Sequence, residues 1–134
     1  MRFKIDPKNK KRQFDILISR AEERLEEAKI LFQKEHCNGA VSRAYYSFFE
    51  TAHAVLITKG MTAKTHAGLI ALFSLHFIKT KKIPLKFVRF FKQAKEAREE
   101  ADYGLLKKFT KKETEKIIET AKEFIKLVKS KFKV

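Results

Sequence analysis

Apolar residues recur at three- and four-residue steps in five successive segments of this chain, and no segment shows the sustained apolar/polar alternation of a β-strand. The first segment, from about residue 12 to about residue 36, has its apolar positions at Phe14, Leu17, Ile18, Ala21, Leu25, Ala28, Leu31 and Phe32. This spacing forms one apolar stripe on a helix. The connections between segments are short, which favours antiparallel neighbours. We therefore predict an all-α fold, an up-and-down antiparallel bundle of four to five helices.

Helix-breaking and capping residues predict the boundaries in the first half of the chain. Asn38 and Gly39 are expected to lie before the second helix, which should end near Gly60. Thr62 is the expected N-cap of the third helix, because a threonine hydroxyl accepts a hydrogen bond from a free N–H of the first turn.

The second half has equally local signals. Pro84 suits the first turn of a fourth helix, and Gly104 is expected to end it. Thr110 and Glu113 have the spacing of a capping box, which predicts the start of the fifth helix. With 134 residues, the chain is long enough for one domain with a core of its own, to which 13 Phe contribute. We expect residues 1–11 to form a basic N-terminal arm and residues 12–134 to form the helical domain.

Positive charge is concentrated in one part of the chain. Between Glu50 and Glu96 there is no acidic residue, and the same window holds nine cations: Lys59, Lys64, Lys79, Lys81, Lys82, Lys86, Arg89, Lys92 and Lys95. The formal net charge is +15 and the pI is about 10.0. Such asymmetry favours an anionic partner, most plausibly a nucleic acid, although a lysine-rich solvated surface has the same composition.

Other features bear on location and cofactors. The single Cys37 excludes an intrachain disulfide, and we find neither a signal-peptide pattern nor a long apolar run, so we expect a cytoplasmic protein without membrane segments. Histidines and Cys37 lack the spacing of metal ligands, and glycine-rich phosphate loops are absent, so we expect no metal and no cofactor. Abundant Lys and Glu with few Asn, Gln and Cys indicate a thermophilic source.

The second helical segment carries an unusual polar stripe. Arg43, Tyr46, Glu50 and His53 fall within an arc of about 80° on a helix. The stripe could hold a phosphate beside a proton-transfer group, with Arg43 and His53 as the binding residues. Alternatively, Arg43 and Glu50 form an internal network that orders helix packing or a dimer interface.

Two further sets of residues are candidates for binding. Lys64 and His66 flank Thr65 at the expected first turn of the third helix, where free N–H groups favour an anion, although capping or packing explains Thr65 and His66 equally well. Arg98 and Tyr103 lie near the end of the fourth helix. They either point into a cleft, or Arg98 pairs with the acidic residue four positions later on the helix surface.

Three blocks of sequence resemble the HEPN family of small helical proteins. They are A-V-S-R-A-Y-Y-S-F-F-E-T-A-H-A-V-L at 40–56, K-G-M-T-A-K-T-H-A-G-L-I-A-L-F at 59–73 and A-R-E-E-A-D-Y-G at 97–104. Their order is similar to that in a small, largely uncharacterised prokaryotic branch, often partnered with a minimal nucleotidyltransferase. The resemblance covers roughly residues 12 to 130. It implies an antiparallel helical bundle that pairs as a homodimer.

The resemblance also implies where RNA cleavage would occur. Active HEPN ribonucleases and toxins use an arginine followed, after four to six residues, by a histidine, in a cleft between two protomers. Arg98 matches the arginine, but Tyr103 stands where the histidine is expected. A tyrosine with a pKa near 10 is a poor base at neutral pH. We therefore hypothesise a HEPN-type dimer that binds RNA or a nucleotide and works with a nucleotidyltransferase, as in a toxin–antitoxin pair.

Two alternatives remain open at this point. One is a divergent metal-independent ribonuclease that uses Arg98 and Tyr103, with His53 or His66 as a further candidate. The other is a helical module whose basic face binds an acidic protein. For RNA or nucleotide binding, the predicted contact residues are Arg43, His53, Lys64, His66, Lys81, Lys82, Arg89 and Arg98.

Overall fold

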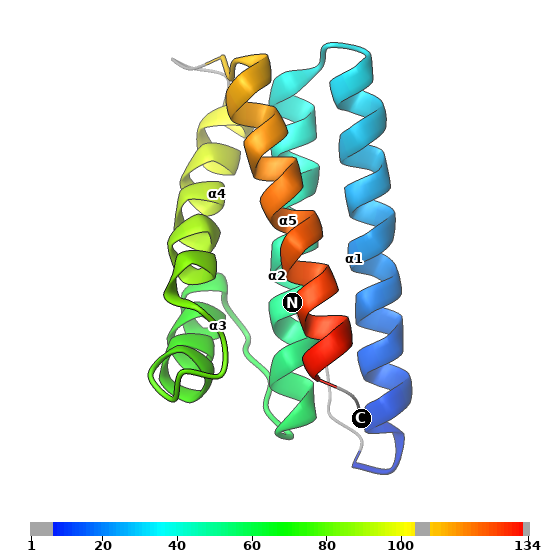
Figure 1. Ribbon diagram of the computed structural model, residues 1–134, viewed down its shortest axis with the longest axis vertical. Coiled ribbons are helices and arrows are strands. Elements are labelled where there is room, and N and C mark those ends of the chain that lie inside the picture. The colour runs from blue at the N-terminus through cyan, green and yellow to red at the C-terminus, as the bar shows by residue number, and fades with distance from the viewer. Residues whose placement is uncertain (1–6, 104–107, 133–134) are drawn as a thin grey trace.

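The computed structural model describes residues 7–103 and 108–132, and most of them are helical. The elements are a 3-10 turn η1 (Pro7–Asn9), α1 (Lys10–Gln33), α2 (Cys37–Thr58), α3 (His66–Phe73), a π-helix η2 (Ser74–Ile78), α4 (Leu85–Tyr103) and α5 (Lys111–Lys131). Figure 1 shows α1, α2, α4 and α5 side by side with alternating directions, and the shorter α3 below α4. The described residues contain no strand. The predicted all-α antiparallel bundle is confirmed.

Helix α2 is the centre of the bundle, in contact with α1, α3, α4 and α5. From Ala40 to Ile57, all but four of its residues are buried. Because its neighbours cover nearly the whole circumference, α2 has apolar residues on most sides rather than on one stripe. Two of these four residues, Arg43 and Glu50, pair with residues of α1, so little of α2 is left to contribute to a surface site.

Phenylalanine rings join the other helices to α2. The ring centroid of Phe124 in α5 lies 5.7 Å from that of Phe48 in α2 and 5.1 Å from that of Phe87 in α4. Phe73 of α3 meets the same ring edge-on at 5.8 Å. These contacts fall in the range favoured by aromatic pairs, so one side chain of α5 connects three other helices.

The N-terminal boundary differs from the prediction. Residues 7–11, which were assigned to a basic arm, are helical, and α1 begins at Lys10 rather than near residue 12. Pro7 opens η1, a position that suits its fixed φ and missing N–H. The Lys10 Cε atom lies 3.8 Å from the position that a Cβ would take on Gly60, so the start of α1 meets the end of α2. Residues 1–6 of the predicted arm lie outside the described part of the chain.

Asn38 and Gly39 lie in the first turn of α2, not before it as predicted. The chain reverses earlier, at Glu35, whose φ of 65° is in the left-handed region. The Asn38 Oδ1 atom accepts a hydrogen bond of 3.1 Å from the Phe109 N–H. A Cβ on Gly39 would lie 3.3 Å from Leu31 Cδ1, so the small residue allows a close approach to α1. These tertiary contacts compensate for the weak helix propensity of both residues.

The start of the third helix was also predicted wrongly. Thr65, not Thr62, is the N-cap of α3, and its side chain accepts a hydrogen bond of 2.9 Å from the Gly68 N–H. The Thr62 hydroxyl is instead 2.8 Å from His53 Nε2. Two threonines precede the same apolar run, and the buried histidine engages the first of them.

The later boundaries agree better with the sequence. Pro84 directly precedes α4, and its carbonyl accepts a hydrogen bond from the Phe87 N–H. The capping box of α5 is confirmed, because Thr110 and Glu113 each accept a backbone N–H of the other at 3.1 Å. Gly104, the expected end of α4, lies outside the described residues.

A π-helix follows α3 without a break. The Lys79 N–H donates to the Ser74 carbonyl five residues earlier, at 2.9 Å. A tight turn follows, in which Lys81 has a φ of 59°. The N–H groups of Lys82 and Ile83 both donate to the Phe77 carbonyl. Ile83 is buried, so it anchors this turn to the core while the preceding lysines remain in solvent.

Candidate nucleic-acid interface

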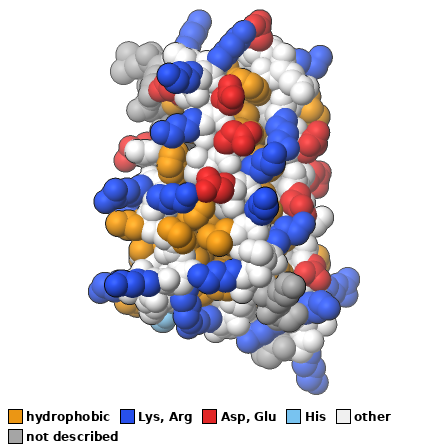
Figure 2. All heavy atoms as spheres, viewed as in Figure 1, with side chains coloured by type: hydrophobic (Ala, Val, Ile, Leu, Met, Phe, Trp, Pro, Cys, Tyr) orange, Lys and Arg blue, Asp and Glu red, His pale blue; other side chains and the backbone are white. Residues whose placement is uncertain are grey.

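The turn after η2 and the outer side of α4 form one exposed cationic surface, which we name the basic face. Its members are Lys79, Lys81, Lys82, Lys86, Arg89 and Lys92, all exposed. Lys86, Arg89 and Lys92 are three residues apart, so they share one side of α4. In Figure 2 the lower left of the view, where Figure 1 places α3 and this turn, carries Lys and Arg side chains and no acidic side chain.

Little of this charge is neutralised within the protein. Lys86 forms an ion pair of 2.7 Å with Glu123 of α5, and both side chains are about half exposed. No ion pair between described residues involves the other cations of the basic face. An anion can therefore reach them without first displacing a carboxylate, which is the electrostatic requirement for binding phosphates.

His53 lies inside the bundle rather than on a polar surface stripe. Its side chain is 1% exposed, and its Nε2 shares the hydrogen bond with Thr62. Burial lowers the pKa of His53 to about 4, because removal from water penalises the charged ring. The ring is therefore neutral at neutral pH and does not present a cation to a ligand in this conformation.

Two other stripe residues, Arg43 and Glu50, pair with α1, an arrangement that the sequence did not reveal. The Nη1 of Arg24 is 2.6 Å from Glu27, and its Nε is 3.5 Å from Glu50. Arg43 Nη1 is 4.0 Å from Glu27. A polar network therefore exists, but it runs through Arg24 and Glu27 rather than directly between Arg43 and Glu50.

Burial changes the proton affinity of one member of this network. It raises the pKa of Glu50, although Arg24 acts in the opposite direction. The hydrogen bond to Glu27 raises the pKa of Arg24. Arg43 is the most exposed cation of the set, with 46% of its side chain accessible, so it remains a candidate for contact with an anion.

His66 is held by packing. Its Nδ1 is 2.6 Å from the hydroxyl of buried Tyr45, and its ring centroid is 4.3 Å from that of Phe49. Thr65 caps the helix, as described above. Lys64 is exposed beside them. Of this predicted set, Lys64 is therefore the residue most accessible to an anion, while the ring of His66 mainly connects α3 to α2.

Arg98 and Tyr103 both belong to the last turns of α4. Their side chains lie outside the described residues, so the predicted cleft with an arginine and a tyrosine stays a prediction.

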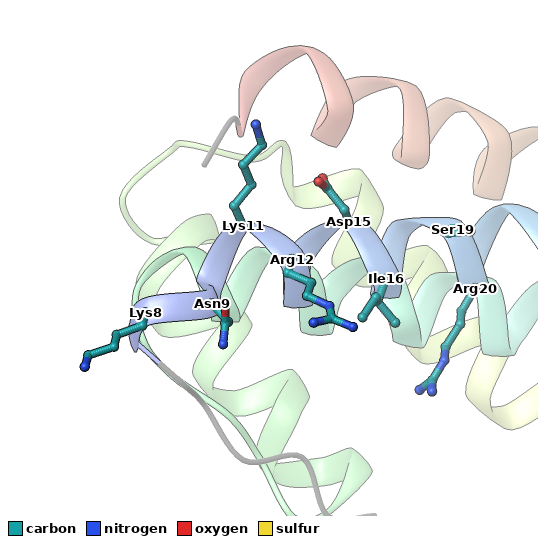
Figure 3. A pocket seen from close by; sticks show the side chains of 8 residues that line it. All are labelled: Lys8, Asn9, Lys11, Arg12, Asp15, Ile16, Ser19 and Arg20. Atoms are coloured by element: carbon teal, nitrogen blue, oxygen red, sulfur yellow. The ribbon is translucent and has the colours of Figure 1, made fainter.

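A second basic region, missed by the sequence analysis, lies on α1. An open hollow of about 590 Å³ is lined by Lys8, Asn9, Lys11, Arg12, Asp15, Ile16, Ser19 and Arg20. Figure 3 shows Arg12, Ile16 and Arg20 extending from one side of α1, with Lys11 and Asp15 on the other. The signal that could have found it is the sequence of Arg12, Ile16 and Arg20, in which each arginine is four residues from the isoleucine and therefore on the same side of a helix.

In the part of the chain that the structure describes, no three His, Cys, Asp or Glu side chains come together as metal ligands. None of the described helices combines the length and apolar character that crossing a membrane requires.

Comparison with known proteins gives the family. The sequence profile of the HEPN domain matches residues 14–131, which is most of the chain. This chain belongs to the HEPN family. The position of the match agrees with the bundle, since it extends from the first turns of α1 to the end of α5.

Three proteins similar to this HEPN protein cover most of its length. "Putative toxin MJ0142" of Methanocaldococcus jannaschii is 34% identical over 129 residues, which cover 96% of this chain and 88% of that protein. "Putative toxin MJ0605" of the same organism is 38% identical over 126 residues, which cover 94% of this chain and 93% of that protein. A UPF0332 protein of Thermotoga maritima is 35% identical over 106 residues, which cover 79% of this chain and 80% of that protein.

Proposed function

We propose that this HEPN protein is the toxin-like half of a toxin–antitoxin-like pair and that it binds RNA through phosphate groups. The observation that carries the proposal is the basic face, whose cations are exposed and, Lys86 apart, form no ion pair among the described residues. The names of the two Methanocaldococcus jannaschii relatives support a toxin-like role. The proposed protein partner is a nucleotidyltransferase, as the resemblance to small HEPN proteins implies.

RNA fits the basic face better than an isolated nucleotide does. Lys86 and Lys92 alone are separated by about 9 Å along the axis of α4, because a helix rises about 1.5 Å per residue. The lysines of the preceding turn extend the face further. A cationic surface of this length can contact several phosphates of one strand, whereas a nucleotide would use a small part of it.

Salt dependence tests the RNA proposal. Each phosphate neutralised on a single strand contributes about −0.7 to the slope of log K against log salt. Arg89→Glu with Lys92→Glu removes two cations from α4, so we expect weaker binding of single-stranded RNA and a slope smaller by about 1.4. Lys122→Glu with Lys126→Glu changes the net charge equally on exposed positions of α5 and is the matched control.

Two outcomes would contradict RNA binding at this face. One is an affinity that does not change between low and physiological salt. The other is an equal loss in the α4 and α5 variants, which would mean that RNA responds to total charge rather than to the basic face. Circular dichroism of each variant establishes that the bundle is intact.

We further propose that the protein is a homodimer. Leu75 and Leu85 are each 50% exposed, and Ile16 and Ile30 are also accessible, so apolar surface remains outside the core of one protomer. Light scattering at micromolar concentration should give twice the protomer mass. A monomer mass would refute this part of the proposal without affecting the RNA test.

A further inference from the structure

Three lysines from distant parts of the chain meet at one end of the bundle, and we name them the lysine corner. Lys59 is the C-cap of α2, Lys82 lies in the turn before α4, and Lys131 is in the last turn of α5. The Lys131 Nζ donates a hydrogen bond of 2.5 Å to the Lys82 carbonyl. Lys59 lies over the ring of Phe77, and the carbonyl of the same phenylalanine accepts the Lys82 N–H, so the backbone brings Lys59 and Lys82 to the same corner.

The backbone and the core hold this arrangement in place. The left-handed conformation of Lys81 and the two hydrogen bonds to the Phe77 carbonyl fix the direction of the chain at Lys82. The Lys59 Nζ lies 5.7 Å from the ring centroid of buried Phe77, a distance that allows a cation–π contact. The same phenylalanine therefore positions both lysines.

Helix ends do not explain the close approach. A lysine near the C-terminus of a helix interacts favourably with the helix dipole, which accounts for Lys59 and Lys131 individually. This interaction with the helix dipole would be equally favourable if the amino groups lay far apart. Instead, the contact between Lys59 and Lys82 lowers the pKa of Lys82, since two ammonium groups cannot donate to each other and like charges repel.

Two acidic residues, on α5 and α1, pair with lysines outside the corner. Glu123 pairs with Lys86, and Glu22 pairs with Lys129 at 3.1 Å. Among the described residues, no ion pair involves a member of the lysine corner. An external anion would relieve the repulsion and accept hydrogen bonds from several ammonium groups at once.

We propose that Lys59, Lys82 and Lys131 bind a phosphate monoester, the group found at the end of an RNA strand or on a nucleotide. Three cations are better matched by its two negative charges than by the single charge of a backbone diester, because the second pKa of a phosphate monoester is about 6. The site deepens the RNA-binding proposal and rests on it for the source of the phosphate. The basic face would then contact the following backbone.

Side-chain NMR of lysine ammonium groups tests the site directly. Titration with inorganic phosphate at low ionic strength should shift the Nζ signals of all three lysines and raise the pKa of Lys82, because an anion favours its charged form. Dimethyl phosphate, a monoanionic diester, should shift them at least tenfold more weakly. Equal responses to both anions would overturn the assignment to a monoester.

RNA with and without a terminal phosphate tests the source. We expect 5′-phosphorylated RNA to bind at least fivefold more tightly than the same strand with a 5′-hydroxyl. Lys82→Gln and Lys131→Gln should each abolish this preference, whereas Lys126→Gln, the same charge change at an exposed position of α5, should leave it intact. A preference that survives both corner variants would overturn the proposal.

The two proposals can fail separately. If both RNAs bind equally and Arg89→Glu with Lys92→Glu weakens them, the basic face binds RNA and the lysine corner is not a monoester site. If inorganic phosphate binds at the corner and neither RNA binds, the lysine corner is a phosphate site but RNA is not its ligand. The phosphate then comes from a free nucleotide or from inorganic phosphate. Titration with adenosine monophosphate distinguishes these two sources.

Discussion

The buried histidine of α2 makes the stability of this protein depend on pH in a calculable way. The pKa of His53 is about 4 in the folded protein, and a histidine in an unfolded chain has a pKa of about 6.5. Between these values the unfolded chain binds a proton that the folded protein does not. The free energy of unfolding therefore falls as the pH falls from about 6.5 towards 4.

The size of the effect follows from the two pKa values. We expect His53 to cost about 2 kcal/mol of stability between about pH 7 and about pH 5, and about 3 kcal/mol in total. Other groups titrate in the same range. The raised pKa of Glu50 makes its contribution opposite in sign, since the folded protein then binds a proton more readily than the unfolded chain does. A variant is therefore needed to isolate the histidine.

His53→Gln is the informative variant, because an amide at that position can still reach the Thr62 hydroxyl but does not titrate. Urea unfolding of both proteins between about pH 7 and pH 4 gives the difference in stability at each pH. We expect the difference to change by about 2 kcal/mol in favour of the variant between about pH 7 and pH 5.

Parallel curves for the two proteins would refute the reasoning, as would an NMR titration of His53 with a pKa near 6.5. The same variant tests the prediction, made from the sequence, that His53 contacts RNA or a nucleotide. Because the ring is buried, His53→Gln should leave RNA affinity at neutral pH unchanged. A marked loss of affinity in a correctly folded variant would mean that the ring reaches RNA after all.

Three further predictions concern the core, the helix ends and catalysis. Phe124→Ala should lower the free energy of unfolding by about 3–5 kcal/mol in urea denaturation, since it removes a buried ring that contacts three helices, while Phe124→Leu should cost clearly less. Equal costs would contradict this view of the core. Thr110→Ala should lower the free energy of unfolding by about 1 kcal/mol, and a change near zero would mean that the capping box is not stabilising. Tyr103→His rebuilds the family's arginine–histidine spacing with Arg98, so we expect metal-independent RNA cleavage to appear in that variant and to be lost when Arg98→Ala is added. Robust cleavage by the unmodified protein, lost in Arg98→Ala alone, would instead favour the divergent ribonuclease.

Interactions between residues close in sequence were predictable, and those that depend on tertiary partners were not. The capping box of Thr110 and Glu113 involves two side chains and two backbone groups within one turn, so spacing alone was sufficient. Thr62 and Thr65 are equally good caps in the sequence. The choice between them depends on His53, which becomes a partner only when α2 and α3 are placed side by side.

The same limit applies to the candidate sites. The exposure of the basic face followed from its charge, since lysine and arginine are rarely buried. The polar stripe was misjudged because Arg24 and Glu27, which complete its network, come from α1. The meeting of Lys59 with Lys82 and Lys131 required the positions of three helix ends, and no local pattern contains that information.

The π-helix after α3 is a place where the length of the chain can change by one residue. A π-turn contains one residue more than an α-turn, so η2 is equivalent to a single-residue insertion into a regular helix. Deleting the half-exposed Leu75 would let the segment return to a regular α-helix, and the residues after it would keep nearly the same direction. Phe77 would then stay close to its position against Phe73 and beneath Lys59. During divergence, HEPN proteins that retain this corner should therefore accept the loss of one residue here more readily than in the regular turns of α3.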